Sequence, residues 1–112
     1  MLDVFAALQS VPVPAFRGAF RPTAEYPEPP DTYCVYLTSR TPDWPADDSD
    51  TAERRRAFLH LYALGDPEAA QAAIEAAMRA EGWRLAYVND DYVEGSGHYE
   101  VLSEWTAVEA WP

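Results

Sequence analysis

The segment that most constrains the fold runs from Asp66 to Gly82, because it carries both the start and the stop signal of a helix. Asp66 is placed to cap the first turn, Pro67 suits the first helical position, and Glu68 puts a negative charge at the positive end of the helix dipole. Gly82 is the expected left-handed terminator. The pattern therefore predicts a helix that ends at about Ala80.

A stripe made mostly of alanine predicts that this helix packs closely against a sheet. The stripe comprises Ala70, Ala73, Ile74, Ala77 and Met78. Gln71, Glu75 and Arg79 are expected to face solvent. Glu75 and Arg79 lie four residues apart, which is the spacing of a favourable ion pair on a helix.

Four stretches around the helix have the alternation and the aromatic or β-branched content of strands. They are expected at Thr32–Thr38, Arg54–Ala63, Arg84–Tyr92 and His98–Val108. The alternation assigns the side chains of the first two strands to opposite faces. In the first strand, one face carries Tyr33, Val35 and Leu37 and the other carries Cys34 and Tyr36. In the second strand, one face carries Leu59 and Leu61 and the other carries Phe58, His60 and Tyr62. Gly95 and Gly97 suit a hairpin between the last two strands.

The chain before the first strand is expected to hold a short helix followed by proline-rich connections. Residues 2–8 place Leu2, Phe5, Ala6 and Leu8 near one helical face, and Val11–Pro14 ends that helix. Residues 15–20 can form a short extended piece, and residues 22–30 form a semi-rigid proline-rich connector.

These elements predict one α+β domain over residues 1–112. We expect an antiparallel, mostly meander sheet of about four strands, with two helices on one face. The length of 112 residues and the 48% hydrophobic content are sufficient for a single core. The whole chain is therefore not expected to be disordered.

The charge balance disfavours binding to polyanions. Nineteen acidic residues face eight arginines and no lysine, which gives a formal net charge of −11. Binding to nucleic acid or to an anionic membrane surface requires clustered cations. The one basic cluster, Arg54-Arg55-Arg56, follows the acidic residues Asp47, Asp48 and Asp50, and we interpret it as a solvated strand edge or a local partner of those acids.

A long acidic loop at residues 39–53 carries the candidate functional residues. Loops of this length in compact domains are either functional or disordered. The candidates for an acidic surface that lines a channel are Asp43, Asp47, Asp48 and Asp50. Trp44 is either an anchor for a neighbouring subunit or a lid on the core of its own domain.

No catalytic or cofactor motif is present, and we expect neither enzymatic activity nor a cofactor. The sequence has no glycine-rich phosphate loop, nucleophile elbow or HExxH pattern. Cys34, His60 and His98 fall on three expected strands, but without the close ligand spacing of a structural zinc site. Asp47, Asp48 and Asp50 do not match the calcium-binding loop either. No metal site is expected.

The succession of elements resembles the tail-completion and tail-terminator proteins of long-tailed phages and prophages. The residues that carry the resemblance are "VPVPAF", "YCVYLTS", "RRRAFLHLYALGDPEAAQAAIEAAMRAEGW" and "DDYVEGSGHYEVLSEW". The most specific stretch is Phe58–Trp83, with Leu61-Tyr62 at the strand end and Gly82-Trp83 after the helix. The lack of lysine and the proline density of residues 22–30 depart from many members of the family.

The resemblance implies a structural virion subunit that forms a ring, commonly a hexamer, caps the tail tube and joins it to the head. Its partners would be other copies of itself, tail-tube proteins and head-connector proteins, with DNA as an unbound passenger and no membrane. It would lie in the host cytoplasm during assembly and then in the virion tail. The alternatives are a head–tail connector component, a protein-binding α+β module outside phages, and a small-molecule-binding or enzymatic α+β domain that uses the aromatic face of the sheet.

Overall fold

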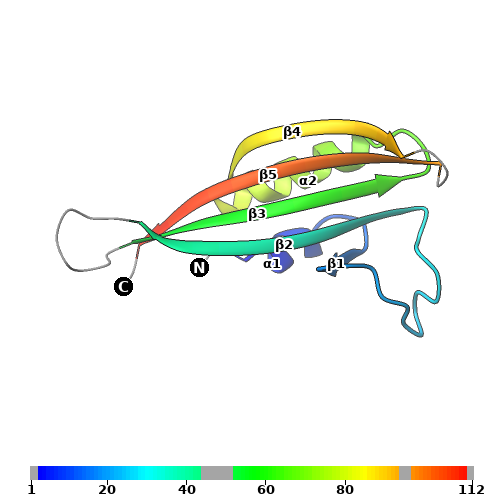
Figure 1. Cartoon of the computed structure of the whole chain (residues 1–112), viewed down its shortest axis with the longest axis horizontal. Helices are drawn as coiled ribbons and strands as arrows, with labels where there is room; N and C mark the ends of the chain where they lie inside the picture. The colour runs from blue at the N-terminus through cyan, green and yellow to red at the C-terminus, as the bar shows by residue number, and fades with distance from the viewer. Residues whose placement is uncertain (1–2, 44–51, 94–96, 111–112) are drawn as a thin grey trace.

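The computed structural model describes residues 3–43, 52–93 and 97–110 as one sheet with two helices. The helices are α1 (Val4–Gln9) and α2 (Glu68–Glu81). The strands are β1 (Ala15–Arg17), β2 (Thr32–Asp43), β3 (Ala52–Ala63), β4 (Arg84–Val93) and β5 (His98–Ala110). Both helices lie behind the sheet in Figure 1, so they cover the same face. The expected α+β class is confirmed.

The five strands form one mixed sheet in the order β1-β2-β3-β5-β4. β1 pairs parallel with β2, whereas every other pair is antiparallel. The expectation of about four antiparallel strands is therefore wrong in the strand number and in the direction of one strand. β1 has only three residues, too few to show an alternation in the sequence. Two backbone hydrogen bonds flank it, from Cys34 N to the Pro14 oxygen and from Gly18 N to the Tyr36 oxygen.

The sheet is also not a simple meander, because β5 lies between β3 and β4. β5 pairs antiparallel with both neighbours, so β3 and β4 run in the same direction. The chain passes from β3 to β4 through α2, which crosses the face behind β5 (Figure 1). Because β5 fills the position between β3 and β4, the β3–α2–β4 crossover holds α2 across the sheet.

The predicted loop at 39–53 is shorter than expected, because β2 and β3 continue as a hairpin. β2 extends to Asp43 and β3 begins at Ala52, where the two residues pair. Arg40 and Glu53, on the two strands, lie 3.7 Å apart between Nη1 and Oε1. Pro42 is tolerated there because β1 reaches only as far as Tyr36, which leaves this part of β2 without a second neighbour.

The predicted face sets of the two central strands are confirmed. Cys34 pairs with Leu61 and Tyr36 with Leu59, and all four side chains are buried on the face that the helices cover. From β5 the same face receives Val101, Ser103 and Trp105. Ser103 is fully buried, and its Oγ accepts a hydrogen bond of 3.0 Å from Trp105 Nε1. This buried hydroxyl is thus satisfied locally.

α1 contributes a different face to the core than its spacing predicted. Val4, Ala7 and Leu8 are buried, whereas Phe5 is exposed and Ala6 faces solvent. The helix begins two residues later than expected, and Val4, Ala7 and Leu8 have the same i, i+3, i+4 spacing as the predicted set, so spacing alone could not decide between the two faces. Asp3 caps it by accepting from Ala6 N through its side chain.

α2 starts one residue later than predicted, with Pro67 and not Asp66 as the N-cap. Asp66 still stabilises the start, because its Oδ1 accepts a hydrogen bond of 2.9 Å from Glu68 N. The predicted terminator is confirmed: Gly82 has φ 107°, and its N–H donates to the Arg79 carbonyl oxygen.

The buried face of α2 includes one residue that was expected to face solvent. Ile74 and Met78 are fully buried, and the stripe alanines Ala70, Ala73 and Ala77 pack against the core. Gln71 is buried as well, which corrects its predicted exposure. The expected pair is confirmed, with Arg79 Nη1 3.4 Å from Glu75 Oε1.

Gly82→Ala should lower the free energy of unfolding by about 1 kcal/mol, because a Cβ is disfavoured at a left-handed φ. Gly65→Ala is the matched control. Gly65 has no positive φ, and a Cβ there would meet nothing within 4 Å. Urea denaturation of both variants measures the difference. Equal stability of the two variants would contradict the assigned role of Gly82 as the helix terminator.

Candidate interaction surface

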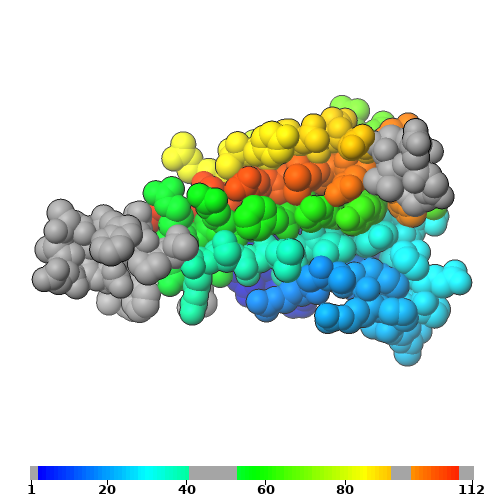
Figure 2. All heavy atoms as spheres, in the orientation of Figure 1, coloured from blue at the N-terminus to red at the C-terminus, as the bar shows by residue number. Residues whose placement is uncertain are grey.

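No helix among the described residues lies on the second face of the sheet, which forms a broad surface of side chains that we call the open face. Figure 2 looks onto it, with β2, β3, β5 and β4 side by side. Register and burial place these residues on it: Tyr33, Val35 and Leu37 from β2, Phe58, His60 and Tyr62 from β3, His98, Glu100, Leu102 and Glu104 from β5, and Tyr87 from β4. Most of them are half-buried by their neighbours in the sheet.

Aromatic rings gather at one end of the open face around Tyr33. Tyr33 stacks on Tyr62 with ring centroids 5.0 Å apart and contacts Phe16, Phe20 and His98 at 6.1, 6.0 and 6.2 Å. Phe16 also packs edge-on against Tyr26, at 5.8 Å. The aromatic cluster therefore anchors the proline-rich connector to the sheet. Edge-to-face and offset-stacked pairs of this kind add to simple burial.

A hydrogen bond and an ion pair lie across the open face between β3 and β5. His60 Nδ1 lies 2.8 Å from Glu100 Oε1 and donates to it, and Arg56 Nη1 lies 3.8 Å from Glu104 Oε1. His60 also stacks parallel to Tyr62, with centroids 6.4 Å apart. These partly exposed pairs fix side-chain positions and contribute little stability.

Burial and a nearby carboxylate shift the titration of the aromatic cluster. Partial burial raises the pKa of Tyr62 and Tyr33, and the negative charge of Glu100 raises both further. Cys34 lies on the opposite, helix-covered face, where burial raises the pKa of its thiol to about 12. The thiol is therefore protonated and unreactive at neutral pH.

Large apolar side chains remain exposed on the open face. Leu37 is 47% exposed, and Tyr87 and Val108 are exposed to a similar degree. They come from three strands, β2, β4 and β5. Leu37 and Tyr87 lie in one row across the sheet, with Phe58 and Glu104 between them. Exposed large apolar side chains on one face are typical of surfaces that contact another protein.

The loop candidates from the sequence lie almost entirely outside the described residues. Trp44, Asp47, Asp48 and Asp50 belong to residues 44–51, and Asp43 ends β2, where its backbone pairs with Ala52. The structure therefore describes only the paired ends of this segment, Asp43 and Ala52.

The arginines and the possible metal ligands are separated by the two faces of the sheet. Arg56 pairs with Glu104 on the open face, whereas the guanidinium of Arg55 lies 5.9 Å above the Trp83 ring. Cys34 points to the helix-covered face, opposite His60 and His98, so these three side chains do not meet. Within the described ranges, no three His, Cys, Asp or Glu side chains are arranged to hold a metal ion.

Sequence reasoning missed the aromatic cluster as a unit. The signal was present in the alternation of Phe58, His60 and Tyr62, whose faces were assigned correctly. The missing information was the packing of Phe16 and Phe20 onto Tyr33, because these residues lie in a segment without periodicity.

Comparison with known proteins adds no assignment. No family model matches this chain, and no curated protein matches it significantly. Among the described residues, no helix is both long enough and apolar enough to cross a membrane.

Glu100→Gln should lower the pKa of the Tyr33 and Tyr62 phenols, because removal of a nearby negative charge favours the tyrosinate. NMR titration of the tyrosine ring Cζ signals measures each phenol separately. Glu104→Gln, on the same strand and face, should leave both pKa values unchanged. Identical titrations in the parent and in Glu100→Gln would show that Glu100 does not act on the cluster.

Proposed function

We propose that this chain is a structural subunit of a phage or prophage tail that forms a ring, caps the tail tube and joins it to the head. Its resemblance to tail-completion and tail-terminator proteins, over Phe58–Trp83 and the final hairpin, supports the proposal. The proposal assigns no catalytic step and no cofactor to the chain. The ring partners are copies of the same chain, and the end partners are tail-tube and head-connector proteins.

The observation that carries the proposal is the open face. Among the described residues, helices cover one face of the five-stranded sheet, while the other face exposes Leu37, Tyr87 and Val108 and carries the aromatic cluster at one end. Aromatic side chains are enriched in protein interfaces, and a small domain gains stability when such a face is covered. Association with another copy of the chain would cover it.

The two edges of the sheet are unlike, which favours a ring over a simple dimer. One edge is the ten-residue β4, and the other is formed by the three-residue β1 and the rest of β2. A contact between unlike surfaces of neighbouring copies repeats around an axis and closes into a ring where the rotation allows.

The charge of the chain suits a channel through which DNA passes without binding. A subunit of net charge −11 repels phosphate at short range, and physiological salt screens the repulsion beyond about 8 Å. Our candidates for the channel lining are Asp43, Asp47, Asp48 and Asp50, which the sequence places between β2 and β3.

The exposed edge of β4 favours a second candidate, a general protein-binding module. An unpaired edge strand can accept a strand from another protein. Such a module would stay monomeric until its partner arrives, whereas a ring subunit would associate with itself. A head–tail connector component remains the alternative within the virion, at a neighbouring position to that of a tail terminator.

Leu37→Glu and Tyr87→Glu should each block self-association, because a charge would be buried in the interface that the open face forms. We expect the parent chain to associate in a concentration-dependent manner, either alone or only when tail tubes are present. Light scattering over a concentration series, with and without assembled tubes, measures this. Phe5→Glu, which adds the same charge at an exposed site on α1, is the control. A parent chain that stays monomeric and does not bind assembled tubes would contradict the proposal that it forms a ring.

Changing Asp43, Asp47, Asp48 and Asp50 to lysine should make an assembled ring retain DNA, with the steep salt dependence of phosphate contacts. Assembly should persist, because the core is unchanged. If the loop is instead a subunit contact, the same changes and Trp44→Ala alone should block assembly. Particle yield and DNA retention distinguish these results. Normal assembly and unchanged DNA handling in both variants would show that the loop has neither role.

A further inference from the structure

The outer edge of β2 offers backbone groups whose direction follows from the pairing with β1. The Tyr36 oxygen accepts a hydrogen bond from Gly18 N on this outer side. Because backbone groups point alternately to the two sides of a strand, Thr38 and Arg40 point theirs to the same outer side. β1 pairs with β2 only as far as Tyr36, so no strand among the described residues lies beside Thr38 and Arg40.

The other edge of the sheet, β4, has outward backbone groups that follow from the same alternation. Along an antiparallel pair, residues that bond to one neighbouring strand alternate with residues that bond to the other. Through the registers of β3 and β5, Asn89 and Asp91 bond to β5, whereas Val88 and Asp90 point their backbone groups outward. β4 is the last strand in the order of the sheet, so these groups face solvent.

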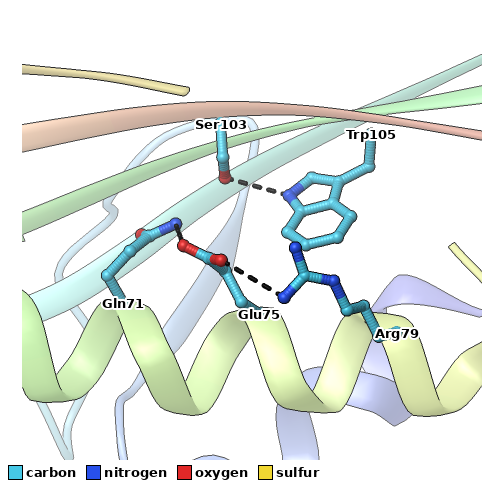
Figure 3. A network of polar contacts seen from close by, with 5 residues as sticks. All are labelled: Gln71, Glu75, Arg79, Ser103 and Trp105. Atoms are coloured by element: carbon cyan, nitrogen blue, oxygen red, sulfur yellow. Dashed lines mark hydrogen bonds and ion pairs between the residues drawn. The ribbon is translucent and has the colours of Figure 1, made fainter. Parts of the chain in front are cut away.

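The outward residues of both edges have their side chains on the helix-covered face. Ser103 of β5 points toward α2 (Figure 3) and pairs with Val88, so Val88 and Asp90 share its face. Arg40 shares the face of the buried Cys34 on β2. Residues directly opposite in an antiparallel pair have side chains on the same face. If β4 of one copy paired with β2 of the next, the helices of both copies would lie on the same side of one continued sheet.

Strand direction and the ends of the free edge on β2 also suit this pairing. β2 and β4 run in opposite directions, because β2 is antiparallel to β3 and β3 has the direction of β4. A copy added at this edge would therefore pair antiparallel. Tyr36 is already bonded toward β1, and Pro42 has no N–H. Thr38 and Arg40 are thus the outward residues of β2 that offer both a donor and an acceptor.

The register that uses both of these residues also pairs opposite charges. It sets Tyr92 against Thr38 and Asp90 against Arg40, whose side chain is 74% exposed and lies 3.7 Å from Glu53. A charge on an edge strand excludes strands that do not neutralise it, so Asp90 selects an edge that carries a cation. Two β4 edges paired with each other would instead place the Asp90 side chains of both copies opposite or diagonal to each other, which is unfavourable.

We propose that neighbouring copies of this chain join by backbone pairing of β4 with the outer edge of β2, antiparallel and with Asp90 opposite Arg40. The occupant of the β4 edge is thus a second copy of the chain. Leu37 and Tyr87, two exposed apolar residues of the open face, are adjacent in sequence to the paired residues and flank the contact. The inference rests on the proposed function, because the partner is the next copy in the ring, and it names the contact that the ring uses.

Amide hydrogen exchange, quenched and then read by NMR after dissociation, tests the backbone pairing. In the monomer, the amides of Val88 and Asp90 should exchange fast, whereas the amide of Asn89 should exchange slowly because it bonds to β5. In the assembled chain, alone or on tail tubes, exchange at Val88, Asp90, Thr38 and Arg40 should slow by about tenfold or more.

The outcomes of this experiment separate the contact from the ring. Assembly that leaves these amides in fast exchange would overturn the contact and leave the ring standing. Slower exchange on β4 alone would also overturn it, because β4 would then pair with a strand other than β2. A chain that never associates would overturn both the contact and the ring.

A charge swap tests the specificity of the contact. Asp90→Arg and Arg40→Asp should each raise the concentration at which half of the chains associate by about tenfold, because each sets like charges opposite one another. The two changes shift the net charge in opposite directions, so general repulsion cannot explain the same effect in both. An equimolar mixture of the two variants should associate as the parent does, since every contact then pairs opposite charges. Parental association of each variant, or a mixture no better than its components at parental thermal stability, would overturn the proposal.

Discussion

The structure depends on the packing of α2 against the middle of the sheet. Ile74 and Met78 of the helix, together with Trp83 directly after it, meet Leu59, Leu61 and Trp105 in a fully buried layer. Burial of large aliphatic and aromatic side chains is the main stabilising contribution in a domain of this size. Because β5 lies between β3 and β4, this one helix holds three strands together. α1 extends the same layer under β2 with Val4 and Leu8.

The same packing explains why the two sides of the sheet differ in character. Two helices of six and fourteen residues suffice for one face only, and they do not cover all of it. Where α2 begins, Tyr99 and Val88 remain accessible and an acidic pocket forms between α2, β4 and β5. On the other face, aromatic stacking and the pairs His60–Glu100 and Arg56–Glu104 take the place of a helix layer. The open face and the pocket at the start of α2 therefore both follow from limited helix coverage.

Much of the fold was predictable, because its strongest signals are local. The helix terminator Gly82, the Glu75–Arg79 pair and the faces of β2 and β3 depend on spacing within a few residues, and all are confirmed. The parallel pairing of β1 and the insertion of β5 depend on contacts between distant segments, which no local pattern encodes. Gln71 was assigned to solvent because its polarity suggested so, whereas its helical position next to Ile74 and Met78 places it inside. The loop candidates Asp43 to Asp50 remain a prediction.

The insertion of β5 between β3 and β4 also bears on synthesis by the ribosome. β3, α2 and β4 emerge before β5, so β3 and β4 both lack the strand that lies between them until β5 is made. Until then the inner edges of β3 and β4 expose unpaired backbone groups, and the apolar side of α2 has an incomplete sheet to cover. Non-local pairing of this kind delays folding until β5 has been made. A nascent chain of this protein is therefore expected to need protection from aggregation until β5 has been made.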